Sequence, residues 1–171
     1  MGQNGVVCRL IAVVLAAIFG ATEGHAQGRI AQSGWEGFAV LGSDSRFERC
    51  VLYNRTIAAL NDSPYDMLGL SRDRAGAIGM LVFYRPRALK RAPDVPVQLK
   101  FDQDAGVTVR GEVRSDFHVR VAGPLGSKLV DTLRQANTLT VTTQGRTQKF
   151  ALADVGAVLD ALAGCVKANA Q

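Results

Sequence analysis

The segment from Val107 to Val121 alternates apolar and polar side chains with a period of two residues. The apolar positions are Val107, Val109, Val113, Phe117, Val119 and Val121, and the polar positions include Thr108, Arg110, Glu112, Arg114, His118 and Arg120. Successive side chains of a β-strand point to opposite faces. The alternation therefore predicts strands over 107–113 and 117–121, in a sheet with one apolar face and one solvated face.

The rest of the chain adds further strands and two helices. Short apolar segments bounded by turn residues predict strands from Trp35 onward and over 47–53, 65–71, 77–84, 97–101, 139–143 and 147–152. The apolar period lengthens over 125–136, with Ser127 as a candidate N-cap, and again after Asp154, the expected cap of the last helix. Strands followed by helices, without βαβ alternation, indicate an α+β domain. We expect about eight short, mostly antiparallel strands in a sandwich or an open barrel, with a late amphipathic helix and a C-terminal helix.

The N-terminus has the pattern of a secretory signal peptide. Arg9 precedes a ten-residue apolar run over 10–19, and Gly24 and Ala26 occupy the −3 and −1 positions of a cut before Gln27. Ten helical residues rise about 15 Å, which is too short to span a bilayer core about 30 Å thick. The alternative to a signal peptide is therefore a buried N-terminal helix. We predict a signal peptide over 1–26, a polar lead-in over 27–34, a single β-rich globular domain over 35–168 and a tail over 169–171.

Cleavage at this position changes the cysteine count. It removes Cys8 and leaves Cys50 and Cys165, an even pair that indicates a disulfide in an exported domain. Cys165 lies beside the apolar stripe of the last helix, where a cysteine on a strand can meet it. The bridge would close most of the domain into one loop, which stabilises a fold by roughly 4–5 kcal/mol in the chain-entropy model. Two buried free thiols are the alternative.

One cluster has the residue types of an acid–base site. Asp116, His118 and Arg120 follow each other at every second position of a predicted strand, so their side chains share a face. A histidine beside a carboxylate can act as a general base, although a solvated sheet face accounts for the same residues. With a single histidine and two cysteines after residue 26, the chain lacks the ligands of a transition-metal site. We therefore expect no enzyme activity, no metal and no cofactor.

The basic residues gather in a proline-rich stretch. Segment 85–96 holds three of the five prolines together with Arg85, Arg87, Lys90 and Arg91. Because proline interrupts helices and central strands, we expect an exposed connection there. Its charge fits an anionic surface such as lipid headgroups or lipopolysaccharide, and a solvated loop is the alternative. Nucleic acid is not expected, because aromatic residues are not interleaved with the basic ones. The formal charge of +5 survives cleavage, which removes one residue of each sign.

Several short motifs occur in a recognisable order. Trp35 is followed by Cys50, and later come LVDTLR at 129–134, LTV at 139–141, FAL at 150–152 and LDALAGC at 159–165. This order resembles small exported bacterial proteins of the invasion-associated locus B type over most of 35–166. Members of that type often carry more cysteines in the middle of the chain, where this chain has none. The resemblance implies a periplasmic or secreted non-enzymatic protein linked to envelope integrity or host contact, and it supplies no catalytic residues.

Three functions remain open at this point. The first is an exported, disulfide-closed domain that is envelope-associated or binds an unknown protein or envelope component, without a transmembrane segment after processing. The second is a periplasmic hydrolase that uses His118 and Asp116. The third is a protein inhibitor of an envelope-directed enzyme.

Overall fold

A single antiparallel sheet of ten strands forms the body of the protein. In the computed structural model, which describes residues 28–63, 65–121 and 123–170, the strand order is β1-β2-β3-β4-β5-β8-β7-β6-β9-β10. The predicted signal peptide lies outside the described residues. The elements are β1 (Ile30–Gln32), β2 (Trp35–Leu41), β3 (Phe47–Tyr53), α1 (Ile57–Asp62), β4 (Met67–Asp73), β5 (Ile78–Phe83), β6 (Ala92–Phe101), β7 (Val107–Val113), β8 (His118–Val121), α2 (Ser127–Gln135), β9 (Thr138–Thr143), β10 (Arg146–Ala151) and α3 (Val155–Asn169).

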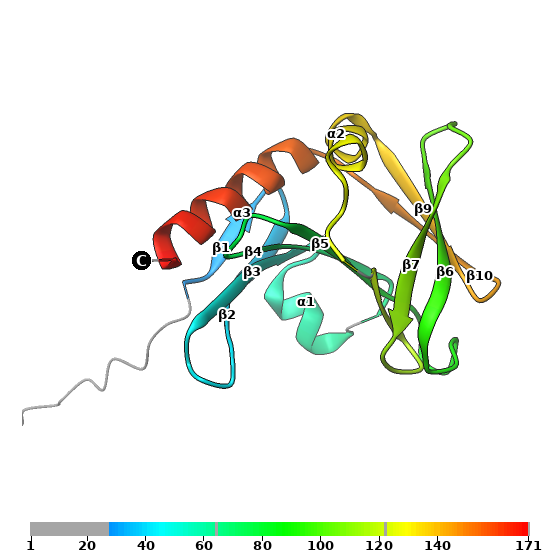
Figure 1. Cartoon of the computed structure of the whole chain (residues 1–171), viewed down its shortest axis with the longest axis horizontal. Coiled ribbons are helices and arrows are strands. Elements are labelled where there is room, and N and C mark those ends of the chain that lie inside the picture. Colours follow the sequence, from blue (N-terminus) through cyan, green and yellow to red (C-terminus); the bar gives the residue numbers. More distant parts are fainter. Residues whose placement is uncertain (1–27, 64, 122, 171) are drawn as a thin grey trace, which may run out of the picture.

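The helices divide the two faces of the sheet between them. Helix α3 packs on β1 to β4 and against α2, whereas α1 lies on the other side of the strands (Figure 1). The core lies between the sheet and the two later helices, and its fully buried side chains include Leu52, Leu70, Met80, Leu159 and Leu162. The predicted α+β class, with mostly antiparallel strands, a late helix and a C-terminal helix, is confirmed. All ten strands belong to one bent sheet, with β1 and β10 at its two ends (Figure 1).

Two short elements lie where the sequence predicts none. Residues Ile30–Gln32, inside the predicted polar lead-in, pair antiparallel with β2 and form the edge strand β1. Residues Ile57–Asp62 form α1, whose N-cap Thr56 accepts a hydrogen bond from the Ala59 backbone N–H at 3.2 Å. A three-residue strand and a six-residue helix are too short for an apolar period to be recognised. Nine of the ten strands overlap a range predicted from the sequence, and β1 is the additional one.

The sequence predicts that the proline-rich stretch over 85–96 is an exposed connection, but its last residues belong to a strand. Strand β6 begins at Ala92, not at the predicted Val97, and contains both Pro93 and Pro96. Proline has no N–H to give to a neighbouring strand, so it is tolerated at a free edge or a bulge. Both conditions hold here, because pairing with β9 begins only at Val97 and the register against β7 shifts after Ala92.

The two later helices begin close to their predicted starts. Gly126 occupies the N-cap position of α2, so the predicted cap, Ser127, is instead the first helical residue. The buried Leu125 donates its backbone N–H to the Ile78 carbonyl at 2.8 Å, which fixes the chain just before the helix. Asp154 is the N-cap residue of α3, as predicted, although its side chain makes no cap hydrogen bond.

A disulfide ties the end of the chain to the sheet. Cys50 on β3 and Cys165 on α3 are bonded, with their Cα atoms 6.2 Å apart and a sequence separation of 115. Cys50 is fully buried beneath the helix. The predicted pairing is confirmed, and it fixes α3 over the strands on which it packs.

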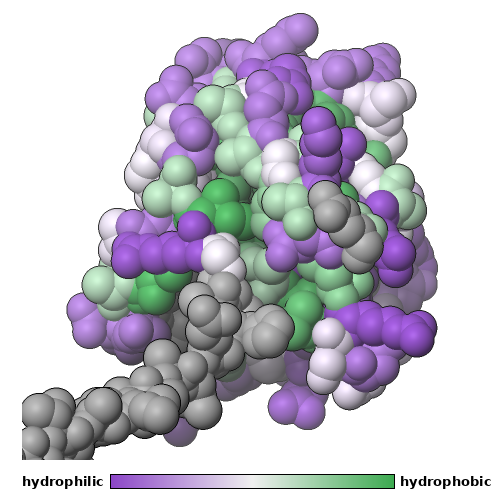
Figure 2. All heavy atoms as spheres, turned by 90° about the vertical axis from the view of Figure 1, so that its left-hand side faces the viewer, coloured by the Kyte–Doolittle hydropathy of each residue, from purple (hydrophilic) through white to green (hydrophobic). Residues whose placement is uncertain are grey.

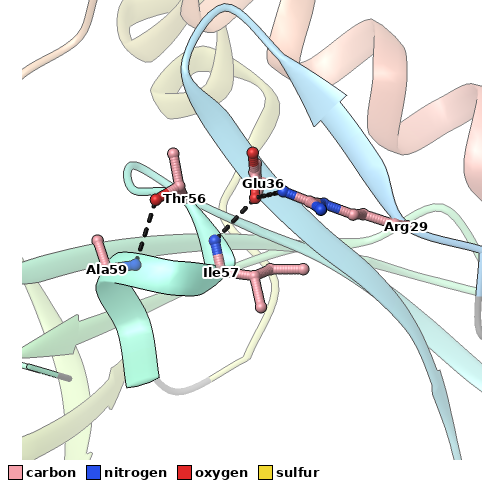
Figure 3. Close-up of polar contacts among 5 residues, drawn as sticks. All are labelled: Arg29, Glu36, Thr56, Ile57 and Ala59. Carbon is pink, nitrogen blue, oxygen red and sulfur yellow. Dashed lines mark hydrogen bonds and ion pairs between the residues drawn. The ribbon is translucent and has the colours of Figure 1, made fainter. Parts of the chain in front are cut away.

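A carboxylate on β2 holds the start of α1. Glu36 accepts a hydrogen bond from the Ile57 backbone N–H at 2.7 Å and one from the Arg29 guanidinium at 2.5 Å (Figure 3). The bond from Ile57, followed by the bond from Arg29, lowers the pKa of Glu36 below its usual value. These contacts fix α1 at one end of the sheet face that α3 leaves uncovered.

Candidate binding site on the open face of the sheet

The open face is the side of β2, β3, β4, β5 and β8 that points away from α3. A row of half-buried aromatic rings crosses it, in the order Phe38, Tyr53, Phe83, Phe117 and Tyr65. Neighbouring rings in this row have centroids 5.4 to 6.4 Å apart. Such spacing is within the range of favourable aromatic pairing. The row gives the open face a continuous apolar strip between polar side chains.

His118 belongs to this strip and not to a catalytic dyad. Its ring stacks on Phe83 with centroids 4.5 Å apart and planes at 4°, because the two residues are directly opposite on β8 and β5. The buried Nε2 atom has no hydrogen-bond partner among the described residues. Burial, followed by the charges of Arg114 and Arg120, lowers the pKa of His118, and Glu112 acts in the opposite direction. The imidazole is therefore held in its neutral form at neutral pH.

The three residues of the predicted acid–base cluster do not share one strand. Strand β8 begins at His118, and Asp116 lies in the bend before it. There the Asp116 carboxylate accepts a hydrogen bond from the Arg87 backbone N–H at 3.2 Å, and its carbonyl accepts one from the Leu89 N–H at 3.0 Å. Asp116 is thus used to hold the connection after β5. Arg120 remains on the open face, opposite Leu81 on β5.

A hollow of about 660 Å³ lies beside His118. We call it the groove. Tyr53, Phe83 and His118 contribute to its lining, together with four arginines and two carboxylates: Arg49, Arg74, Arg114, Arg120, Glu48 and Asp73. The residues come from β3, β4, β5 and β8 and from the turns that follow β4 and β7. The groove is therefore a product of the sheet order and not of one local motif.

Gly69 leaves room for an aromatic ring on the open face. Gly69 on β4 is directly opposite Tyr53 on β3 and Leu81 on β5. A Cβ atom at Gly69 would lie 2.8 Å from the Tyr53 ring and 3.3 Å from the Leu81 Cβ. The missing side chain leaves room for the Tyr53 ring to lie over the strand beside the groove.

The arginines of the groove differ in their partners. Arg114 pairs with Glu112 at 2.9 Å, and Arg49 pairs with Glu48. Arg74 and Arg120 are exposed and form no ion pair with any residue that the structure describes. Two guanidinium groups at the groove are thus available to an anion.

The predicted basic stretch lies elsewhere. Arg85, Arg87, Lys90 and Arg91 are all exposed, and none of them lines the groove. Arg85 pairs with Asp66 at 3.0 Å. The backbone of Lys90 exchanges two hydrogen bonds with the Gln144 side chain, both 2.8 Å, so the stretch is fastened to the turn between β9 and β10.

Large apolar side chains are scarce on the outer surface. Within the described ranges, the large apolar residues classed as exposed are Leu41 and Val107. Figure 2 shows the side that lies on the left in Figure 1, where hydrophobic side chains run through the middle of the face and hydrophilic ones surround them. No helix in the described ranges combines the length and the apolar character needed to cross a membrane. The same residues include no cluster of three or more histidine, cysteine or acidic side chains that would hold a metal ion.

Sequence reasoning found His118 and Arg120 but not the rest of the groove. Tyr53 and Phe83 lie in the predicted strands 47–53 and 77–84, whose nearly continuous apolar residues do not show which side chains face away from the core. No pattern in the sequence indicated that β5 pairs with β8, and this pairing places Phe83 against His118.

The chain was compared with protein families, curated proteins and solved structures. No protein-family model matches the chain, and no curated protein matches it. Among solved structures, the fold is similar to that of invasion associated protein B from Bartonella henselae, with a TM-score of 0.55 and 14% sequence identity. The match covers 82% of this chain and 98% of that one. The resemblance to the invasion-associated locus B type, first indicated by the short motifs, is therefore confirmed at the level of the fold.

Proposed function

We propose that the protein is exported to the periplasm or secreted, and that it works there as a non-enzymatic, envelope-associated binding domain. In this proposal residues 1–26 are removed, and the mature domain holds a protein or envelope component on its open face. The fold shared with invasion associated protein B of Bartonella henselae is consistent with such a role.

The disulfide between Cys50 and Cys165 is the observation that carries the proposal. Disulfides persist in oxidising compartments and are rare in the reducing cytosol. This one joins the third strand to the last helix and encloses most of the folded chain. Together with the signal-peptide pattern at the N-terminus, it favours a working place outside the cytoplasm.

The geometry around His118 favours binding over catalysis. A general base needs an accessible nitrogen within hydrogen-bond reach of the proton that it removes. Here one ring nitrogen is buried and the ring is stacked on Phe83, while the Asp116 carboxylate bonds to the Arg87 backbone. We therefore expect His118→Ala to leave any hydrolytic activity of the preparation unchanged, and a large loss would favour the hydrolase alternative.

Affinity capture from an envelope extract tests the binding role. The oxidised protein is immobilised and incubated with detergent-solubilised envelope, with an empty matrix as the control. We expect one or a few envelope components to be retained in proportion to the immobilised protein. A single enzyme retained at equal stoichiometry and inhibited by the protein would favour the inhibitor alternative. Retention no greater than that of the empty matrix would contradict the proposal.

A further inference from the structure

We propose that the groove binds an acidic protein segment, whose apolar side chains contact the aromatic strip and whose carboxylates pair with the arginines around it. This inference rests on the proposed function, because it names the class of partner for the same exported binding domain.

Charge is the first step of the argument. Two carboxylates, those of Glu48 and Asp73, line the groove together with four arginines. Glu48 already pairs with Arg49, Asp73 accepts a hydrogen bond from the Ala77 backbone N–H, and Arg114 pairs with Glu112, which lies outside the lining. Arg74 and Arg120 have no such partner among the described side chains. The guanidinium group presents a planar fork of N–H donors that matches a carboxylate in a bidentate manner. Carboxylates of a partner would complete these two pairs.

The aromatic strip supplies the apolar part of the groove. Tyr53 and Phe83 are half-buried; Tyr53 lies in the same cross-strand row as Arg120, and Phe83 is directly opposite His118. Aromatic residues and arginine are the types enriched at the energetically dominant centres of protein interfaces. The groove thus combines the two contact types that a protein partner needs.

The position of the groove favours a peptide over a membrane surface. Its floor is the sheet itself, and its arginines, which come from β3, β8 and the turns after β4 and β7, all line one hollow. A layer of lipid headgroups is broad, and it would first meet the exposed basic stretch of Arg85, Arg87, Lys90 and Arg91. An extended chain is narrow enough to lie along a hollow of about 660 Å³. Single-stranded nucleic acid also stacks on aromatic rings, and it is treated as an outcome of the test.

His118 supplies an internal reporter. Its ring lines the groove, and the charged groups that act on it are Arg120 on β8 and Arg114 and Glu112 at β7, while Phe83 covers it from β5. A bound carboxylate adds negative charge near the ring, which raises the pKa of His118. Peptide binding should therefore shift the His118 ring resonances and move their titration to higher pH.

Calorimetric titration with two matched peptides tests the inference. One peptide consists of glutamate and leucine, and in the other glutamine replaces every glutamate. The variant pair is R74Q/R120Q in the groove and R87Q/R91Q in the basic stretch, so that both double variants lose the same formal charge. All four arginines are exposed, so we expect both proteins to fold, and a circular dichroism spectrum equal to that of the wild type checks this.

We expect the glutamate peptide to bind the wild type and the glutamine peptide to bind at least about tenfold more weakly, because exposed pairs contribute up to about 1 kcal/mol each. R74Q/R120Q should weaken binding about tenfold and R87Q/R91Q less than about twofold, with the His118 resonances shifting only where binding persists. Equal weakening by both variants, no binding of the glutamate peptide, or tighter binding of a single-stranded oligonucleotide or of anionic vesicles would overturn the inference.

The same variants separate this inference from the proposed function. If the wild type and R74Q/R120Q retain the same envelope component equally well, the groove is not its site, and the inference fails while the proposed function stands. If neither protein retains any component, the proposed function itself fails.

Discussion

Removing the disulfide should cost the fold a large part of its stability. The bridge between Cys50 and Cys165 closes a loop of 115 residues, and a constraint of that length restricts the unfolded chain enough to stabilise the fold by about 4–5 kcal/mol. Domains of this size are stable by only about 5–15 kcal/mol. We therefore expect the double variant C50A/C165A to lose between a third and nearly all of its free energy of unfolding.

Urea unfolding followed by circular dichroism measures the loss. The oxidised wild type and C50A/C165A are compared with and without dithiothreitol. We expect the reductant to move the wild-type midpoint close to that of the variant and to leave the variant unchanged, which separates the bridge from the side-chain change. A difference below about 1 kcal/mol would refute the argument, because it falls outside the range that loop closure of this length predicts. A wild-type midpoint insensitive to reductant would also refute it.

Three further predictions concern the sheet and its last helix. The fold lowers the pKa of His118 from its ordinary value of 6.5, so below that pH the unfolded chain binds more protons than the folded one and stability falls with acidification. The urea midpoint of the wild type should therefore fall more between pH 7 and pH 5 than that of H118Q. Gly69→Ala should destabilise by about 1–3 kcal/mol, because the new methyl group meets the Tyr53 ring. Gly164→Ala, in open space on helix α3, should instead stabilise by about 0.5–1 kcal/mol. Thermal or urea unfolding that gave the two glycine variants the same sign would contradict the packing described here.

Local periodicity predicted the parts of the fold that are locally determined. The alternation over β7 and β8 placed Val113 and Val119 in the core and Arg120 on the outer face, as the structure has them. It was wrong for Val107, which is exposed at the start of β7, and for Phe117, which precedes β8 and packs in the aromatic strip. The helical stripe of α3 placed Cys165 next to buried side chains, which was enough to anticipate its meeting with a strand-borne cysteine. These features follow from neighbours within a few residues of each other.

Features that depend on strand order were beyond the sequence. The pairing of β5 with β8, across 35 positions between Phe83 and His118, builds the aromatic strip and the groove, and no local pattern specifies it. Pro93 and Pro96 argued against a strand, yet β6 includes them because its first half pairs on one side only. Asp116 left the predicted cluster because backbone N–H groups after β5 need an acceptor, and its oxygens provide one.

The central claim is that this is an exported domain closed by one disulfide, and the intact mass of the protein from its native compartment tests it most directly. Protein is recovered from the periplasmic fraction and from the culture medium and is analysed without reductant. We expect the mass of residues 27–171 less two hydrogens, which are lost when Cys50 and Cys165 bond. Reduction should increase the measured mass by those two hydrogens. Recovery of the whole 171-residue chain from the cytoplasm, with its mass unchanged by reduction, would contradict it.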